Sequence, residues 1–219
     1  MYSLGCKPDR PDPRDYQWKN LVTAPVYKQA ATIDRRFYSM VNPDFRINQG
    51  AEGTCVGHGD TNMLLAGTST HPDYPDFQTE ELAHQFARKL YLDATGDTTY
   101  QKGAWPRDAC QVLLDRGLID SYWKVEQVED IITAVLTFGP VGVAVPWYES
   151  MYTPATKFGN SYVRVNLDSE HVGYHWIVAT GVDLSPAEGQ PFFRWQNSWG
   201  HNWGTNGTAR ITIENFRKI

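Results

Sequence analysis

The spacing of apolar residues changes from a helical to a strand-like period near residue 140. Residues 77–93, 106–117 and 125–140 repeat apolar side chains at helical spacing. Later segments are short, rich in β-branched and aromatic residues and separated by turn signals, as strands are. Helices and strands are therefore segregated, which predicts an α+β fold with two lobes. The predicted strands cover residues 141–145, 161–167, 175–183, 192–199 and 208–216.

The first of these predicted helices has a clear start. Thr79 can cap it, and acidic residues follow in its first turn. Leu82, Phe86 and Leu90 fall on one side of the helix, and we expect that side to be buried.

Composition limits the classes of partner. The chain has 219 residues, of which 41% are hydrophobic and 21% charged, so a packed core is expected. Its formal net charge is -5 without runs of like charge, which makes nucleic acid an unexpected partner. No apolar run approaches the ~20 residues of a membrane span. The oligomeric state stays open.

Cysteine usage and the start of the chain predict a cytoplasmic protein. Cys6, Cys55 and Cys110 are an odd number, which gives no disulfide framework. The opening stretch, "MYSLGCKPDRPDPRDYQW", has no apolar signal-peptide core. Residues 1–32 are rich in proline and are predicted to form an extended arm over the domain surface.

The stretch "NQGAEGTCVGHGD", residues 48–60, combines four glycines with one cysteine at a predicted helix start. Thr54 is predicted to cap this helix, which puts Cys55 in its first turn. The positive end of a helix favours a thiolate. Because glycine weakens a helix by about 1 kcal/mol, Gly57 and Gly59 are expected to admit a closely packed neighbour. A buried structural cysteine is the alternative interpretation.

Two later segments carry partners for a reactive thiol. His175 lies in an apolar predicted strand, and Asn197 opens the string "NSWGHNWGTNG". Together with Gln49, six residues before Cys55, these motifs resemble those of the papain-like (C1 type) cysteine peptidases. The resemblance runs over residues 33–213. It implies a papain-like domain over residues 33–219, with a helical lobe (46–125), an antiparallel barrel-like β lobe (126–219) and a cleft between them.

The resemblance also implies a mechanism. Cys55 would be the nucleophile and His175 its base, with Asn197 orienting the imidazole and Trp199 shielding that bond from water. Gln49 and the Cys55 backbone N–H would form the oxyanion hole. A peptide bond would be hydrolysed through a thioester, without metal or cofactor.

A peptide or protein substrate is the implied partner. By resemblance it would lie along the backbone of Gly103 and Ala104. Ala144, Trp176 and Trp105 would line the main pocket, which the bulky Trp176 is expected to reduce or reshape.

Several features depart from the family pattern. Glu52 stands in place of a cysteine that normally forms a disulfide, and Val56 in place of a tryptophan. Glu52 would also bring negative charge near the thiol. Because only residues 1–32 precede the family-like domain, we expect the inhibitory propeptide of the family to be missing, as would suit a bacterial or viral enzyme. Either the enzyme is made active or the arm controls access to the cleft.

Other interpretations remain open. A thiol amidase or transpeptidase acting on cell-wall peptides would use the same residues, and a catalytically silent binding module would keep the fold. His171 and His175 have i,i+4 spacing but lie on a predicted strand, which disfavours a zinc site. His58 is expected at the helix surface or near the cleft. Asp183 is expected in a turn.

Overall fold

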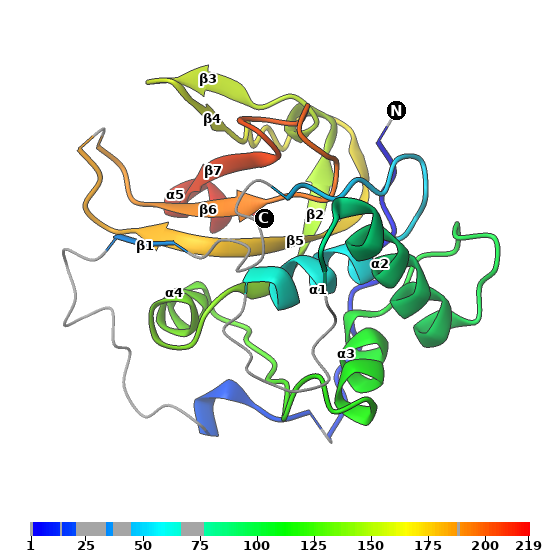
Figure 1. Ribbon diagram of the computed structural model, residues 1–219. Helices are drawn as coiled ribbons and strands as arrows, with labels where there is room; N and C mark the ends of the chain where they lie inside the picture. Colours follow the sequence, from blue (N-terminus) through cyan, green and yellow to red (C-terminus); the bar gives the residue numbers. More distant parts are fainter. Residues whose placement is uncertain (1, 14, 21–33, 37–44, 67–76, 188) are drawn as a thin grey trace.

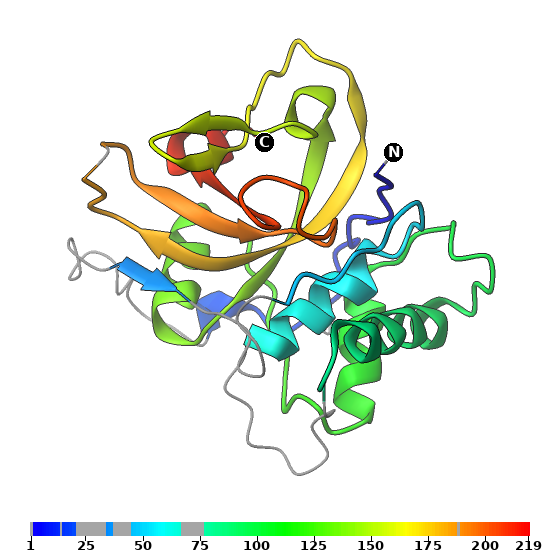
Figure 2. The ribbon, with the colours of Figure 1, turned by 45° about the horizontal axis from the view of Figure 1, so that its top comes forward.

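The computed structural model describes residues 2–13, 15–20, 34–36, 45–66, 77–187 and 189–219. Three helices pack together beside a β-sheet, and the predicted α+β fold with two lobes is confirmed (Figures 1 and 2). Each part has its own cluster of buried apolar side chains. Within the described ranges, no helix is long and apolar enough to cross a bilayer.

Among the described residues, three helices build the helical lobe, and two more pack on the sheet. Short 3-10 turns occupy Trp18–Asn20 and Glu149–Met151. The helices are α1 (Cys55–Ala66), α2 (Glu80–Thr95), α3 (Pro106–Asp115), α4 (Val128–Thr137) and α5 (Ile213–Phe216).

In the described residues, one sheet has the order β1-β5-β6-β7-β4-β3, and β2 also pairs with β5. The predicted antiparallel arrangement holds for every ladder except β4–β7, which is parallel. The strands are β1 (Asp34–Arg36), β2 (Val141–Tyr148), β3 (Ala155–Lys157), β4 (Asn160–Tyr162), β5 (His171–Asp183), β6 (Phe192–Gln196) and β7 (Thr208–Thr212).

Helix α2 begins as predicted, but one residue of its predicted buried side is exposed. The Thr79 hydroxyl accepts a hydrogen bond from the Leu82 N–H at 3.1 Å. Leu82 itself is 45% exposed, whereas Leu90 on the same predicted side is fully buried, so the expectation was wrong for Leu82 alone. Small residues face α1 instead, because the two helices approach closely. The buried residues of α2 are Ala83, Ala87, Leu90 and Tyr91.

Three predicted strands end earlier than expected. The segment 161–167 is extended only through Tyr162, and 192–199 only through Gln196. Residues 208–216 were predicted as one strand, but β7 stops at Thr212 and α5 follows. The Thr212 hydroxyl accepts the Asn215 N–H at 3.1 Å, so a capping bond ends the strand and starts the helix.

Close packing explains the two glycines at the start of α1. A Cβ atom on Gly57 would lie 2.3 Å from the Ala87 carbonyl oxygen in α2. A Cβ atom on Gly59 would lie 2.4 Å from Cδ1 of Trp176 in β5. Both positions therefore require glycine, as the sequence predicted, because neighbouring elements occupy the space of a side chain.

We expect Gly57→Ala to destabilise the protein although alanine favours helices. The propensity gain is about 1 kcal/mol, whereas forcing backbone away from backbone costs about 1–3 kcal/mol or more. Urea unfolding should show a net loss of stability. Gln85→Ala on the exposed side of α2 is the control and should change little. An equal or raised unfolding midpoint for Gly57→Ala would contradict the packing argument.

Candidate active site

Cys55 is the first residue of α1 and is fully buried. The Thr54 carbonyl accepts the His58 N–H, as at a helix start. The Thr54 hydroxyl, however, has no hydrogen-bond partner among the described residues, so the predicted side-chain cap was wrong. A side-chain cap often accepts a hydrogen bond from the second N–H of the helix, which here belongs to Val56. This N–H lies near the Cys55 sulfur and lowers the pKa of the thiol.

His175 and Asn197 meet across neighbouring strands. His175 Nε2 lies 2.7 Å from Asn197 Oδ1, which also accepts the Ser198 N–H at 2.8 Å. The acceptor is therefore the amide oxygen, and Nε2 of a neutral His175 carries the proton. Nδ1 has no partner among the described residues and keeps a free lone pair. Trp199 stacks on the imidazole with ring centroids 4.7 Å apart.

Ser198 holds the side chain of Gln49 in place. Its hydroxyl donates to Gln49 Oε1 at 2.5 Å, and its carbonyl accepts the Gln49 N–H at 2.8 Å. Gln49 Nε2 consequently points away from Ser198 and donates to the Ser3 and Glu52 carbonyls. Sequence reasoning missed this role of Ser198, although the residue stands inside the quoted Asn-Ser-Trp motif.

The beginning of the arm lies in the cleft, not over the outer surface as predicted. The Ala104 N–H donates to Gly5 O, and the Lys7 N–H donates to Ala104 O, both at 2.8 Å. The Cys6 N–H donates to Tyr174 O at 3.3 Å. The part of the arm beyond Asn20 lies outside the described residues.

Gly5 passes over the nucleophile in close contact with the loop before α1. A Cβ atom on Gly5 would lie 2.0 Å from the Gly53 carbonyl oxygen. On the other side, Gly103 has φ +70° and touches the Gly5 carbonyl group. The Gly5 N–H also lies near the Cys55 sulfur. The arm thus covers Cys55 as an extended peptide.

Burial leaves the thiol and the imidazole uncharged. It raises the pKa of Cys55 to about 12, against nearby N–H groups of Trp176, Gly5 and Val56 that lower it. Burial also lowers the pKa of His175 to about 4, although its bond to Asn197 works in the opposite direction. No hydrogen bond joins the two side chains in the described structure, and Nδ1 stays unpaired. With the arm in place, the pair is neutral rather than a thiolate and an imidazolium.

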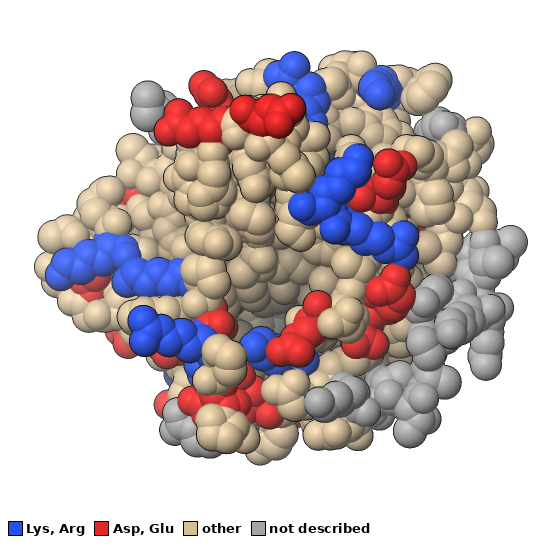
Figure 3. Space-filling model, turned by 180° about the vertical axis from the view of Figure 1, so that it is seen from behind, with Lys and Arg blue, Asp and Glu red and all other residues tan. Residues whose placement is uncertain are grey.

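A cavity of about 380 Å³ continues from the arm between the lobes. Seen from behind, the molecule has a hollow with an uncharged floor and a charged rim (Figure 3). Ala144, Trp176 and Arg107 line this cavity. Trp105 is 40% exposed and lies beneath the Lys7 ammonium group instead.

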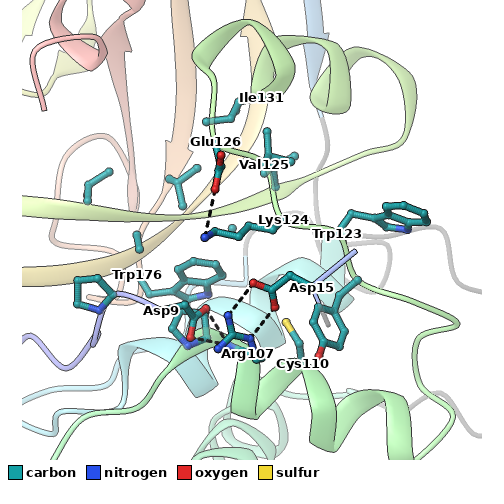
Figure 4. Close-up of a pocket in the computed structure, with 18 of the residues that line it drawn as sticks. Asp9, Asp15, Arg107, Cys110, Trp123, Lys124, Val125, Glu126, Ile131 and Trp176 are labelled. Carbon is teal, nitrogen blue, oxygen red and sulfur yellow. Dashed lines mark hydrogen bonds and ion pairs between the residues drawn. The ribbon is translucent and has the colours of Figure 1, made fainter. Parts of the chain in front are cut away.

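Arg107 fastens the arm at the rim of this cavity. Its guanidinium binds the carboxylate of Asp15 through two hydrogen bonds of 2.8 Å. Its backbone N–H, at the start of α3, donates to Asp9 at 3.1 Å. Figure 4 shows Arg107 between the two carboxylates, with Trp176 nearby. Two separate points of the arm are therefore held by one residue.

Other predicted polar residues have different surroundings. His58, which we expected at the helix surface or near the cleft, is fully buried, and its Nε2 lies 2.9 Å from Nδ1 of His84. Glu52 forms an ion pair with Arg88 at 3.1 Å, which offsets its charge near the thiol. His171 is exposed on β5. In the described ranges, no group of three His, Cys, Asp or Glu residues is arranged to hold a metal ion.

A thiol at a helix start in one lobe, with an imidazole oriented by an amide in the other, defines the class of thiol-dependent hydrolase sites. The family model of the papain family cysteine proteases matches residues 74–218, and the chain belongs to this family. The matched region contains His175 and Asn197. Gln49 and Cys55 precede the matched region, so their place in the site rests on the geometry described above.

Curated relatives match parts of the chain. Cathepsin B-like cysteine proteinase 5 of Caenorhabditis elegans is 36% identical over 93 residues, or 42% of this chain and 24% of that protein. Cathepsin Z of Onchocerca volvulus is 26% identical over 99 residues, or 45% of this chain and 30% of that protein. The chain therefore matches less than a third of the length of these relatives.

Solved structures show the same fold. Xylellain, a cysteine protease from Xylella fastidiosa, gives a TM-score of 0.64 at 17% identity and covers 96% of this chain and 90% of its own. The bromelain protease of Ananas comosus in complex with the E64 inhibitor gives a TM-score of 0.52 at 16% identity and covers 92% of this chain and 90% of its own.

We expect Cys55 to be alkylated slowly in the folded protein. A pKa near 12 leaves few thiolates at pH 8, so iodoacetamide should react more than about a hundredfold slower than with an unhindered cysteine. Mass spectrometry of the peptide that contains Cys55 measures the rate. The same peptide in urea-unfolded protein is the control, and a fast rate in the folded protein would disprove the neutral, covered thiol.

Proposed function

We propose that the chain is a cysteine peptidase that hydrolyses peptide bonds through a thioester, and that residues 2–9 keep it latent. The observation that carries this proposal is the arm itself. The cleft already binds an extended peptide through the N–H and C=O of Ala104. That peptide covers a thiol that has an oriented imidazole on the facing strand.

The chemistry follows from these groups once the arm has left. His175 Nδ1 takes the thiol proton, and Cys55 Sγ attacks the substrate carbonyl carbon. Gln49 Nε2 and the Cys55 N–H donate to the oxyanion. The imidazolium returns the proton to the leaving amine, and water then hydrolyses the thioester. Asn197 keeps the ring in the orientation that both proton transfers need.

The direction of the arm explains why it would inhibit without being cut. His175 protonates the leaving amine, so the carboxy-terminal half of a substrate lies on the side of His175 and Trp199. The arm has its amino-terminal end there, because Tyr2 stacks on Trp199 at 4.6 Å. Cys6 accordingly pairs with Ala104 in parallel. A substrate must run the opposite way.

Gly5→Ala is expected to activate the enzyme in the full chain. The new methyl group would meet the Gly53 carbonyl, which belongs to the backbone, so the arm has to leave the cleft. We expect kcat/KM on a mixed fluorogenic peptide library to rise about tenfold or more, and alkylation of Cys55 to accelerate with it. Covering a site lowers apparent activity by the fraction of molecules that is closed.

Two controls accompany this variant. Pro11→Ala changes an exposed arm residue and should leave activity as it was. Gly5→Ala combined with Cys55→Ala should show no turnover. Native activity equal to that of Gly5→Ala would reject the latch. A Gly5→Ala protein that neither cleaves peptides nor reacts with a thiol-directed epoxide would reject the peptidase and favour a binding module.

The oxyanion role of Gln49 is tested in the Gly5→Ala background. Gln49→Ala removes one donor, so kcat should fall about a hundredfold, with little change in KM. Gln101→Ala, which changes an exposed glutamine next to the same loop, should leave both values unchanged. If kcat survives in Gln49→Ala, another group must stabilise the oxyanion.

A further inference from the structure

Trp176 connects the two lobes directly behind the nucleophile. It follows His175 in β5, and its backbone N–H lies near the Cys55 sulfur. Its indole fills a slot between two glycines, one in α1 and one in β2. Cβ atoms on Gly59 and Gly142 would lie 2.4 Å and 2.1 Å from indole carbons. A side chain at either glycine would therefore collide with the ring.

Asp60 binds the N–H group of that indole. Asp60 Oδ1 accepts the Trp176 Nε1–H at 2.8 Å. The side chain is fully buried in α1, and its Oδ2 has no hydrogen-bond partner among the described residues. A buried carboxyl group with one unused oxygen costs stability. The hydrogen bond from Trp176 is the interaction that offsets part of this cost.

We infer that Asp60 is a positioning residue, which acts through Trp176 to set the approach of His175 to Cys55. The inference rests on the proposed peptidase function. Asp60 stands five residues after Cys55 on the same helix, and Trp176 directly follows His175 on the facing strand. The Asp60–Trp176 bond thus joins the element that carries the nucleophile to the element that carries the base. Small errors in such placement lower kcat strongly.

The test compares Asp60→Ala with Asp60→Asn in the Gly5→Ala background. Asp60→Ala removes the acceptor, and we expect kcat to fall about tenfold or more, with KM within about twofold of its parent. An asparagine oxygen can still accept from Nε1, so Asp60→Asn should keep most of kcat. If Asp60 contributed only to the stability of the fold, Asp60→Ala would not show a selective loss of kcat that asparagine restores.

Asn62→Ala is the matched control. Asn62 is buried two residues further along α1, and its Oδ1 accepts a bond of 3.0 Å from Gln196 in β6. This variant also removes one buried bond between the lobes, but leaves Trp176 alone. It should therefore keep kcat. Thermal unfolding of each variant separates lost positioning from lost folding.

Trp176→Phe decides the matter if Asp60→Ala does not fold. It keeps an aromatic ring, removes the N–H and should lower kcat as Asp60→Ala does. If Asp60→Ala or Trp176→Phe had the same kcat as the Gly5→Ala parent, the positioning role would be overturned. An equal fall of kcat in Asp60→Asn and Asp60→Ala would overturn it too. Absence of turnover in the Gly5→Ala parent would instead reject the proposed function, so the two failures are distinguishable.

Discussion

The packing of α1 against β5 is the contact on which the site depends. The thiol belongs to one lobe and the imidazole to the other, so neither lobe can hold the pair by itself. Gly59 removes a side chain from α1 so that the Trp176 indole can enter, and Gly142 opens β2 for the same ring. Backbone and aromatic surfaces in such close contact leave little room for adjustment. The distance between the lobes is therefore set by packing rather than by polar contacts alone.

The arm uses this same interface as its binding site. Residues 3–7 are held mainly by backbone hydrogen bonds, each worth about 1 kcal/mol net, which makes their attachment reversible. Further along, Arg107 binds Asp15 through two hydrogen bonds and Trp18 is buried. A tether of this kind keeps a released segment at a high effective concentration near the cleft. The arm can then return without help from another chain.

Local patterns in the sequence predicted most of the element types, although residues 213–216 form a helix where a strand was expected. The period change near residue 140 predicts where helices give way to strands, and the resemblance of three motifs to those of the papain-like peptidases points to Cys55, His175 and Asn197. Contacts between distant segments were not predictable in this way. No local signal says that Gly5 lies over Cys55 or that Asp60 meets Trp176, because each contact depends on how the lobes pack. Thr54 illustrates the same limit: it has the right residue type for a cap, yet its hydroxyl is unpaired.

Covering the cleft also changes the chemistry of the groups beneath it. A thiolate and an imidazolium are each stabilised by water or by one another, and a peptide that excludes water without bringing them into contact favours the neutral forms of both. Burial raises the pKa of Cys55 to about 12 and lowers that of His175 to about 4. Departure of the arm would admit water, raise the pKa of the imidazole and lower that of the thiol. Access for the substrate and ionisation of the nucleophile would then be two consequences of one movement.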